Sequence, residues 1–289
     1  MKKFLLRSLF ALVVLLAFNV FLIGLTYWVC SKTSFKLDDN KTVLVLGPSY
    51  LQAAIDPKYF PEAENVSASG TGKMFSYLKL KKFTQINPNI NTIVISMTSS
   101  EMHHLDWYEN ALNTRVPTYF PLMAKEDVFL LLNNPYFYSG IIKSPLQHLN
   151  ILHKSILHKS ITYKDWRIGE FYSSKKVFNS DTAYFKIIKG FANEDEFVDL
   201  ELYYHDKIVT YCKENNLNLV MVKAPQYRYY PDFYDYVRKK YSDITYLCYS
   251  EEPLKIYMAD GVHLNGNGAK WFSQILRNDL ISLGLIDNK

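Results

Sequence analysis

The chain has 289 residues, of which 48% are hydrophobic and 16% aromatic, so it can bury a sizeable core. Its net charge of +5 is mild, and the sequence has no long basic block or nucleic-acid motif, which argues against a nucleic-acid partner. No Cys/His spacing is typical of a zinc site, and no low-complexity tract is present. We therefore expect a globular protein without a metal site.

The N-terminus predicts a membrane anchor. Two lysines and an arginine within the first seven residues precede an uncharged, apolar stretch over 8–31. A spanning helix needs roughly 20 apolar residues, which this stretch supplies. The bulky residues at 26–29 do not suit signal-peptide cleavage, so we expect 1–31 to remain as a cytoplasmic tail and signal anchor. The positive-inside rule then places the body of the chain outside the cytoplasm.

A polar, charged linker at 32–41 is followed by short apolar runs that predict strands and alternate with predicted helices. The predicted strands are 42–46, 64–69, 92–97, 217–222 and 244–248. The predicted helices are 73–86, 196–214, 231–241 and 266–283, with a helical turn at 51–55 and Gly284 as the cap of the last helix. This order predicts an α/β domain over 42–289, a three-layer sandwich around a central, mostly parallel five-stranded sheet.

Residues 98–193 break this alternation. The stretch is rich in aromatic residues, lysine, histidine and proline, and it is too long for a structureless loop in a compact domain. We expect an insertion of short helices that packs as a cap or side wall on the carboxyl edge of the sheet. Outside it, Cys212 and Cys248 could pair in an oxidising compartment, although two separate buried thiols are the expectation.

The first predicted strand delivers a serine to the edge of the sheet. The run 42–46 stops at Gly47-Pro48, and Ser49 follows. Pro48 pushes Gly47 towards an extended conformation, so we expect the strand to end there. In open α/β sheets, sites form outside the carboxyl ends of the strands. Ser49 is therefore a candidate nucleophile.

A second motif, Asp260-Gly-Val-His263, precedes the last predicted helix. An Asp and a His three residues apart can meet if the segment turns, and Gly261 makes such a turn easy. The carboxylate can then hold the imidazole Nδ1–H, which leaves Nε2 free to take a proton from a hydroxyl. A serine becomes a useful nucleophile only with such a base beside it. Taken alone, the motif is also compatible with a solvated turn that caps the helix.

Together, the two motifs resemble those of the SGNH (GDSL-like) hydrolase superfamily. In that family the nucleophilic serine follows the first strand, and a terminal Asp-x-x-His supplies the acid and the base. The resemblance implies a flavodoxin-like SGNH fold in which Ser49 is the nucleophile, Asp260 the orienting acid and His263 the base. It also implies an oxyanion hole formed by the backbone N–H groups of Ser49 and Gly70.

The resemblance covers the sheet and both ends of the domain, but not the insertion. The stretches 55–57 and 69–82 are similar to a membrane-anchored bacterial subgroup that is often linked to acyl groups on surface polysaccharides. This subgroup implies a location in the bacterial inner (cytoplasmic) membrane, with the catalytic domain on the periplasmic side. The implied partners are the membrane and a cell-envelope glycan or acyl ester.

Two departures from the family pattern matter. The family's Asp before the serine is Pro48 here, although the N–H of Ser49 remains. The family also places an Asn after the third strand as a further oxyanion donor, and this chain has Thr98, Ser99 and Ser100 there instead. Losing one such donor typically costs about 3 kcal/mol of transition-state stabilisation. We therefore hypothesise that a hydroxyl of one of these three residues substitutes for it.

The sequence predicts an extracytoplasmic, serine-dependent esterase or O-acyltransferase that acts on acyl esters of an envelope glycan. This chemistry needs no metal or organic cofactor. Gln226, Tyr227 and Arg228 follow a predicted strand, so they are candidates for substrate contact. The alternative, motivated by the two departures, is a catalytically inactive protein that keeps the SGNH fold and binds envelope polysaccharide or a partner protein.

Overall fold

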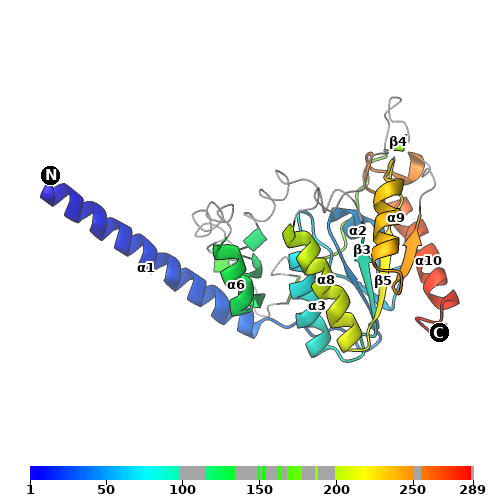
Figure 1. Ribbon diagram of the computed structural model, residues 1–289, viewed down its shortest axis with the longest axis horizontal. Helices are drawn as coiled ribbons and strands as arrows, with labels where there is room; N and C mark the ends of the chain where they lie inside the picture. Colours follow the sequence, from blue (N-terminus) through cyan, green and yellow to red (C-terminus); the bar gives the residue numbers. More distant parts are fainter. Residues whose placement is uncertain are drawn as a thin grey trace. The chain divides into compact units, whose positions relative to one another are not determined.

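The computed structural model describes residues 1–97, 115–116, 118–133, 149, 152–153, 162–164, 168–177, 186–187, 199–249 and 255–287 (Figure 1). The chain divides into two compact units. The first contains Met1–Phe35 and Glu109–Ile168, and the second contains Lys36–Tyr108 and Gly169–Lys289. Every described residue of the predicted catalytic site belongs to the second unit.

The first unit contains the long helix α1 (Lys2–Lys32) and the short helices η1 (Phe120–Leu122) and α6 (Lys125–Leu132). By length and composition, α1 can cross a membrane, and it is the one helix in the described ranges that can. Its 31 residues extend about 46 Å, more than the roughly 30 Å of a hydrocarbon core. Large apolar side chains along it are exposed, as a lipid-facing surface requires.

The second unit is built on a five-stranded parallel sheet in the order β2-β1-β3-β5-β7. The strands are β1 (Val43–Leu46), β2 (Ala63–Asn65), β3 (Thr92–Ser96), β5 (Asn218–Lys223) and β7 (Thr245–Cys248). This is the 2-1-3-4-5 order of flavodoxin-like folds, and it confirms the predicted fold class. A small parallel pair, β4 (Lys186–Ile187) with β6 (Arg228–Tyr229), was not predicted.

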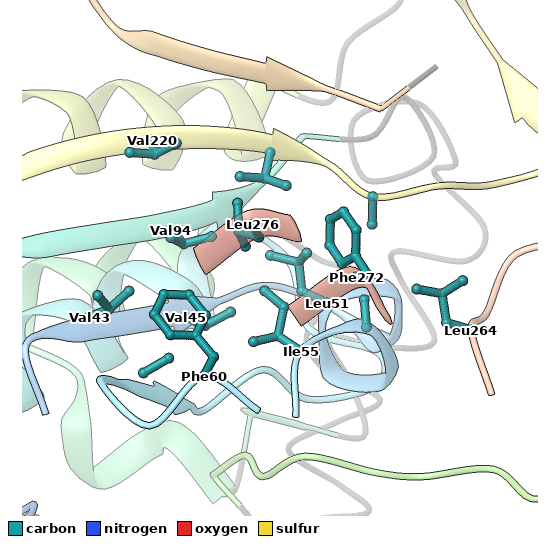
Figure 2. Close-up of a cluster of buried hydrophobic side chains, with 14 of the residues drawn as sticks. Val43, Val45, Leu51, Ile55, Phe60, Val94, Val220, Leu264, Phe272 and Leu276 are labelled. Carbon is teal, nitrogen blue, oxygen red and sulfur yellow. The ribbon is translucent and has the colours of Figure 1, made fainter. Parts of the chain in front are cut away.

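Both faces of the sheet are buried. On one face, Val43, Val94 and Val220 meet apolar side chains of α2 (Ser49–Ala54) and α10 (Gly266–Ser282) in the core cluster that Figure 2 shows. The alternate residues of β1 are equally buried, and side chains of a strand alternate between faces. The opposite face is therefore covered by α3 (Lys73–Ile86) and α8 (Asp199–Glu214), which pack on each other and contact β1 and β5. The remaining described helices of this unit are α9 (Pro231–Lys240) and η4 (Lys255–Tyr257).

Three details bear on the expectations from the sequence. The strand predicted over 64–69 ends at Asn65, whose side-chain amide donates to the carbonyls of Leu51 (2.9 Å) and Ile55 (2.7 Å) and whose side-chain oxygen accepts from Ser67 N–H (3.0 Å). Beyond Asn65 the chain still runs along β1, with Val66 N–H donating to the Val45 carbonyl (3.0 Å) and Ala68 N–H to the Gly47 carbonyl (2.9 Å). Gly284 has φ of 69° just after α10, as expected for a helix cap. Cys212 and Cys248 are separate free thiols, as expected, but Cys212 alone of the two is buried, because Cys248 is partly exposed.

Helix α10 is fastened to the segment that follows α2. The Arg277 guanidinium donates two hydrogen bonds to the Glu62 carboxylate, at 2.9 and 2.6 Å. These bonds from Arg277 are the largest cause holding the pKa of Glu62 below its ordinary value. The Ser273 hydroxyl accepts from the backbone N–H of Asp56 at 2.8 Å. Helix α10 is thus held against the segment that follows α2.

Three lysines are buried where strands end. Each ammonium donates to a backbone carbonyl at the last residue of a strand or just after it, so the buried charge has a hydrogen-bond acceptor. The pairs are Lys73 with the Ser96 carbonyl (2.5 Å), Lys79 with Val66 (2.7 Å) and Lys223 with Tyr249 (3.1 Å).

Burial of Lys223 makes stability depend on alkaline pH. Burial lowers the pKa of Lys223 from 10.5 to about 8, with a small opposing effect of Cys248. Between these values the unfolded chain holds a proton that the folded chain releases, so the free energy of unfolding rises with pH, by up to about 3 kcal/mol. We expect urea unfolding of the full chain in detergent to show this rise between pH 7.5 and 10, and Lys223→Met to lack it. Lys239→Met, at an exposed position, is the matched control, and an unchanged rise in Lys223→Met would contradict the prediction.

Candidate active site

The turn between β1 and α2 places Ser49 at the carboxyl edge of the sheet. Helix α2 begins at Ser49, with Pro48 as its N-cap. A Cβ on Gly47 would lie 2.9 Å from the Cβ and Oγ of Ser96, so glycine is required for this close approach of two strand ends. The Gly47 carbonyl accepts from Ala68 N–H at 2.9 Å and from the Thr71 hydroxyl at 3.2 Å. The Gly47 end of the turn is therefore held by hydrogen bonds from two residues of the segment after β2.

The structure brings Ser49, His263 and Asp260 into one chain of hydrogen bonds. The His263 Nε2 atom lies 2.8 Å from Ser49 Oγ. On the other side of the ring, His263 Nδ1 lies 2.9 Å from Asp260 Oδ2 and 3.1 Å from Oδ1. A carboxylate can only accept, so Nδ1 carries the proton and Nε2 accepts from the serine hydroxyl. This is the arrangement that a serine nucleophile, a base and an orienting acid require.

The turn expected at Gly261 is present, and Asp260 itself forms it. Its Oδ1 accepts from the backbone N–H groups of Val262 (2.8 Å) and His263 (2.9 Å). Partial burial acts to raise the pKa of Asp260, but hydrogen bonds from Val262 and His263 outweigh it and hold the pKa below its ordinary value. Asp260 is therefore a carboxylate at neutral and mildly acidic pH. From outside the turn, Tyr227 N–H donates to the Gly261 carbonyl at 3.2 Å.

The hydrophobic core aligns the two halves of this site. Leu51, two residues after Ser49, and Leu264, directly after His263, belong to the same buried cluster (Figure 2). Asn265 caps α10 by accepting from the backbone N–H groups of residues 267 and 268, both at 3.0 Å. Its amide also donates to the Ile256 carbonyl at 2.8 Å. The segment that carries His263 is thus fixed by packing on one side and by a helix cap on the other.

The ring of Tyr50 lies against one face of the His263 imidazole. The rings of Tyr50 and His263 are stacked, with centroids 5.6 Å apart and an angle of 22° between their planes. The His263 side chain is 28% exposed and that of Asp260 52% exposed, so the site is open to substrate. Sequence reasoning missed Tyr50, because only the tertiary fold brings it to His263.

The predicted oxyanion donors are only partly described. Ser49 is the first residue of α2, so its backbone N–H has no acceptor within the helix. Gly70 has φ of 67°, a conformation that favours glycine, in the turn after β2. Their role as oxyanion donors stays a prediction. Thr98, Ser99 and Ser100 lie outside the described residues.

The residues predicted to contact substrate after β5 need a correction. Tyr227 is 3% exposed and belongs to the hydrophobic core, so its ring is not on the surface, and its backbone instead supports the Asp260 turn. Gln226 is also buried, and its Nε2 atom has no hydrogen-bond partner in the described part of the chain. Arg228 lies in strand β6, paired with Lys186 of β4. The side chains of Gln226 and Tyr227 are therefore buried and do not line the cavity beside Ser49.

A cavity of about 260 Å³ opens beside the serine. It is smaller than the roughly 300–1,000 Å³ typical of pockets for drug-sized ligands. Gln52 and Ser69 form one side, with the Ser69 hydroxyl 2.7 Å from Gln52 Oε1. The lining residues are Ser49, Gln52, Ala53, Ser69, Tyr172, Ser174, Lys176, Ala259, Asp260, His263 and Leu264.

No known family model matches the sequence, and no curated protein matches it. Among solved structures, the chain is similar to a GDSL-like lipase from Bacteroides thetaiotaomicron VPI-5482, at 10% identity and a TM-score of 0.39, over 88% of this chain and 94% of that one. It is also similar to a protein inferred to be an acylhydrolase from Bacteroides fragilis NCTC 9343, at 12% identity and a TM-score of 0.39, over 87% and 91% of the two chains.

The names of these two structures are a GDSL-like lipase and an acylhydrolase. Likeness at this identity and TM-score does not carry the function, which rests on the residues described above. In the part of the chain that the structure describes, no group of three or more His, Cys, Asp or Glu side chains is arranged to hold a metal ion.

Proposed function

We propose that the protein is a serine-dependent acyl-ester hydrolase or O-acyltransferase of the SGNH type. The observation that carries this proposal is the chain of hydrogen bonds from Asp260 through His263 to the Ser49 hydroxyl. Three separate side chains meet there in the order that nucleophilic catalysis needs. If Asp260 formed only a solvated turn that caps the helix, nothing would require His263 Nε2 to lie within hydrogen-bond distance of Ser49, which is 214 positions away in the chain.

The chemistry follows from these contacts. Ser49 Oγ attacks the ester carbonyl carbon while its proton passes to His263 Nε2. The tetrahedral intermediate then collapses, the C–O bond to the alcohol breaks, and His263 gives its proton to the leaving oxygen. The acyl group now rests on Ser49. Water (in a hydrolase) or a sugar hydroxyl (in a transferase) attacks the acyl carbon and loses its proton to His263. The bond between the acyl carbon and Ser49 Oγ then breaks, and His263 returns the proton to Oγ. Asp260 keeps its charge and stabilises the imidazolium formed in each half.

The N-terminal helix supports a location for this activity. Helix α1 is long and apolar enough to span a membrane, and the basic residues precede its apolar stretch. By the positive-inside rule, this arrangement favours a bacterial inner-membrane anchor with the second unit on the periplasmic side. An ester-cleaving domain held at that surface would act on acyl esters of an envelope glycan.

A second candidate is an inactive protein that keeps the fold and binds envelope polysaccharide or a partner protein. It is favoured by Pro48 in place of the family's Asp and by the absence of an Asn at 98–100. An active serine and an inert one differ in reactivity towards a fluorophosphonate, which labels only a serine that a base has activated.

The test is labelling of the full chain in detergent with a fluorophosphonate probe. We expect one labelled peptide, containing Ser49, and strongly reduced labelling of His263→Ala. Ser282→Ala, which removes an exposed hydroxyl at the end of α10, should label like the unaltered protein. A folded protein that takes up no label at Ser49 would reject the enzyme and favour the binding protein, and a glycan-binding measurement would then follow.

A further inference from the structure

A segment within the stretch 98–193 forms one wall of the candidate active site. This wall segment (residues 169–177) enters where Gly169 lies against the Val66 backbone, since a Cβ there would be 1.9 Å from the Val66 carbonyl oxygen. Farther on, Tyr172 N–H donates to the Gln52 carbonyl at 3.2 Å. Gly266 N–H, at the start of α10, donates to the Ser174 carbonyl at 3.0 Å. The wall segment is thus tied to α2 on one side of the site and to α10 on the other.

The wall segment presents Tyr172, Ser174 and Lys176 to the cavity beside Ser49. Tyr172 is 62% exposed, and an exposed aromatic ring in a polar pocket offers an apolar face of the kind on which a sugar ring can rest. The Ser174 hydroxyl accepts from Lys176 N–H at 3.2 Å, which shapes the chain just before the lysine enters the lining. None of these residues is needed for the proton transfers at Ser49.

Lys176 gives the cavity a positive charge that has no ion-pair partner among the described residues. The ion pairs within the described ranges do not include Lys176. The other full charge in the lining is Asp260, whose carboxylate is engaged by His263 and by the backbone of its own turn. An acidic group that enters beside the serine would therefore find a lysine without a competing carboxylate partner in the described structure.

We propose that the wall segment binds the sugar next to the reacting ester, and that Lys176 binds an acidic group of that sugar, a carboxylate or a phosphate. This inference rests on the proposed function and narrows its substrate to an anionic glycan. A lysine suits either group, because its ammonium acts as a compact point charge with three donors. Lys176 is a specificity residue here, and takes no part in the chemistry itself.

The test uses acetyl esters that differ only in the group at C6. The probes are methyl O-acetyl-glucoside, the corresponding glucuronide and the corresponding 6-phosphate, each with the full chain in detergent. We expect the kcat/KM of the better anionic probe to exceed that of the neutral one by about fivefold, the size of one solvent-exposed ion pair, and this ratio to shrink at high salt. Lys176→Gln should bring the ratio to about 1, mainly through KM.

Lys175→Gln is the matched control, because Lys175 is an exposed neighbour that does not line the cavity. It should keep the anionic preference. A preference for the phosphate probe or for the glucuronide supports the inference and identifies the acidic group. Equal kcat/KM for all three probes, or a preference that survives in Lys176→Gln, overturns the inference while the proposed function stands. Failure to cleave even the neutral probe, with Ser49 unlabelled by fluorophosphonate, overturns both.

Discussion

Replacing Ser49 with alanine is expected to lower the turnover of an acetyl ester by roughly 10⁶-fold. In a triad, loss of the nucleophile removes nearly all of the contribution that the three residues make as a unit, leaving only what binding and the oxyanion hole supply. The substitution removes one oxygen, at the atom 2.8 Å from His263 Nε2. The measurement is kcat for 4-nitrophenyl acetate with the full chain in detergent.

Because Ser49 begins α2 and has Pro48 as its N-cap, alanine at this position leaves the turn intact, so the variant should fold. Ser282→Ala, at the exposed end of α10, should retain the turnover of the unaltered protein. If Ser49→Ala kept more than a tenth of the activity, another nucleophile would be acting and the proposed mechanism would be wrong.

Replacing Asp260 with asparagine is expected to lower kcat by about 10⁴-fold. The amide keeps an oxygen that can accept from the backbone N–H groups of Val262 and His263, so the turn should survive. What it loses is the negative charge 2.9 Å from His263 Nδ1. An amide group can also donate to Nδ1, which places the ring proton on Nε2. A protonated Nε2 can no longer accept the proton of the Ser49 hydroxyl.

The control is Asp243→Asn, because Asp243 forms a solvent-exposed ion pair with Lys213, and pairs of this kind contribute little. It should keep normal kcat. Since the pKa of Asp260 lies below its ordinary value, any loss of activity between pH 8 and pH 5 should not come from protonation of this carboxylate. A kcat of Asp260→Asn within tenfold of the unaltered protein would remove Asp260 from its orienting role.

The sheet could be predicted because its strands carry their signal locally. Uninterrupted runs such as Val43–Leu46 and Thr92–Ser96 are typical of strands buried on both faces, and the helix at Lys73–Ile86 was bounded by glycine and proline signals. Strand β2 ends earlier than predicted, at Asn65, whose side-chain amide donates to carbonyls fourteen and ten positions earlier in the chain. No local pattern announces such a contact.

The site was predictable where chemistry requires particular residue types at fixed spacing. Asp260 and His263 are three residues apart, and a serine after the first strand completes the set. Tyr227 was misplaced, because the residue after a strand can turn towards the core or the solvent, and the alternating pattern does not extend beyond the strand. A side wall formed by the insertion was expected, but the residues of the wall segment that line the site, and Tyr50, were not predicted, because their positions depend on tertiary contacts with Gln52 and His263 that have no periodic signature.

The bond between His263 and Ser49 joins residues 214 positions apart. Closing a contact this distant in sequence requires a long stretch of chain to be ordered first. Until α10 docks through Arg277 and Ser273, Ser49 has no base and is an ordinary alcohol. A partly folded chain would therefore not cleave nearby esters. Ester turnover would indicate that the segments carrying Ser49 and His263 have packed together.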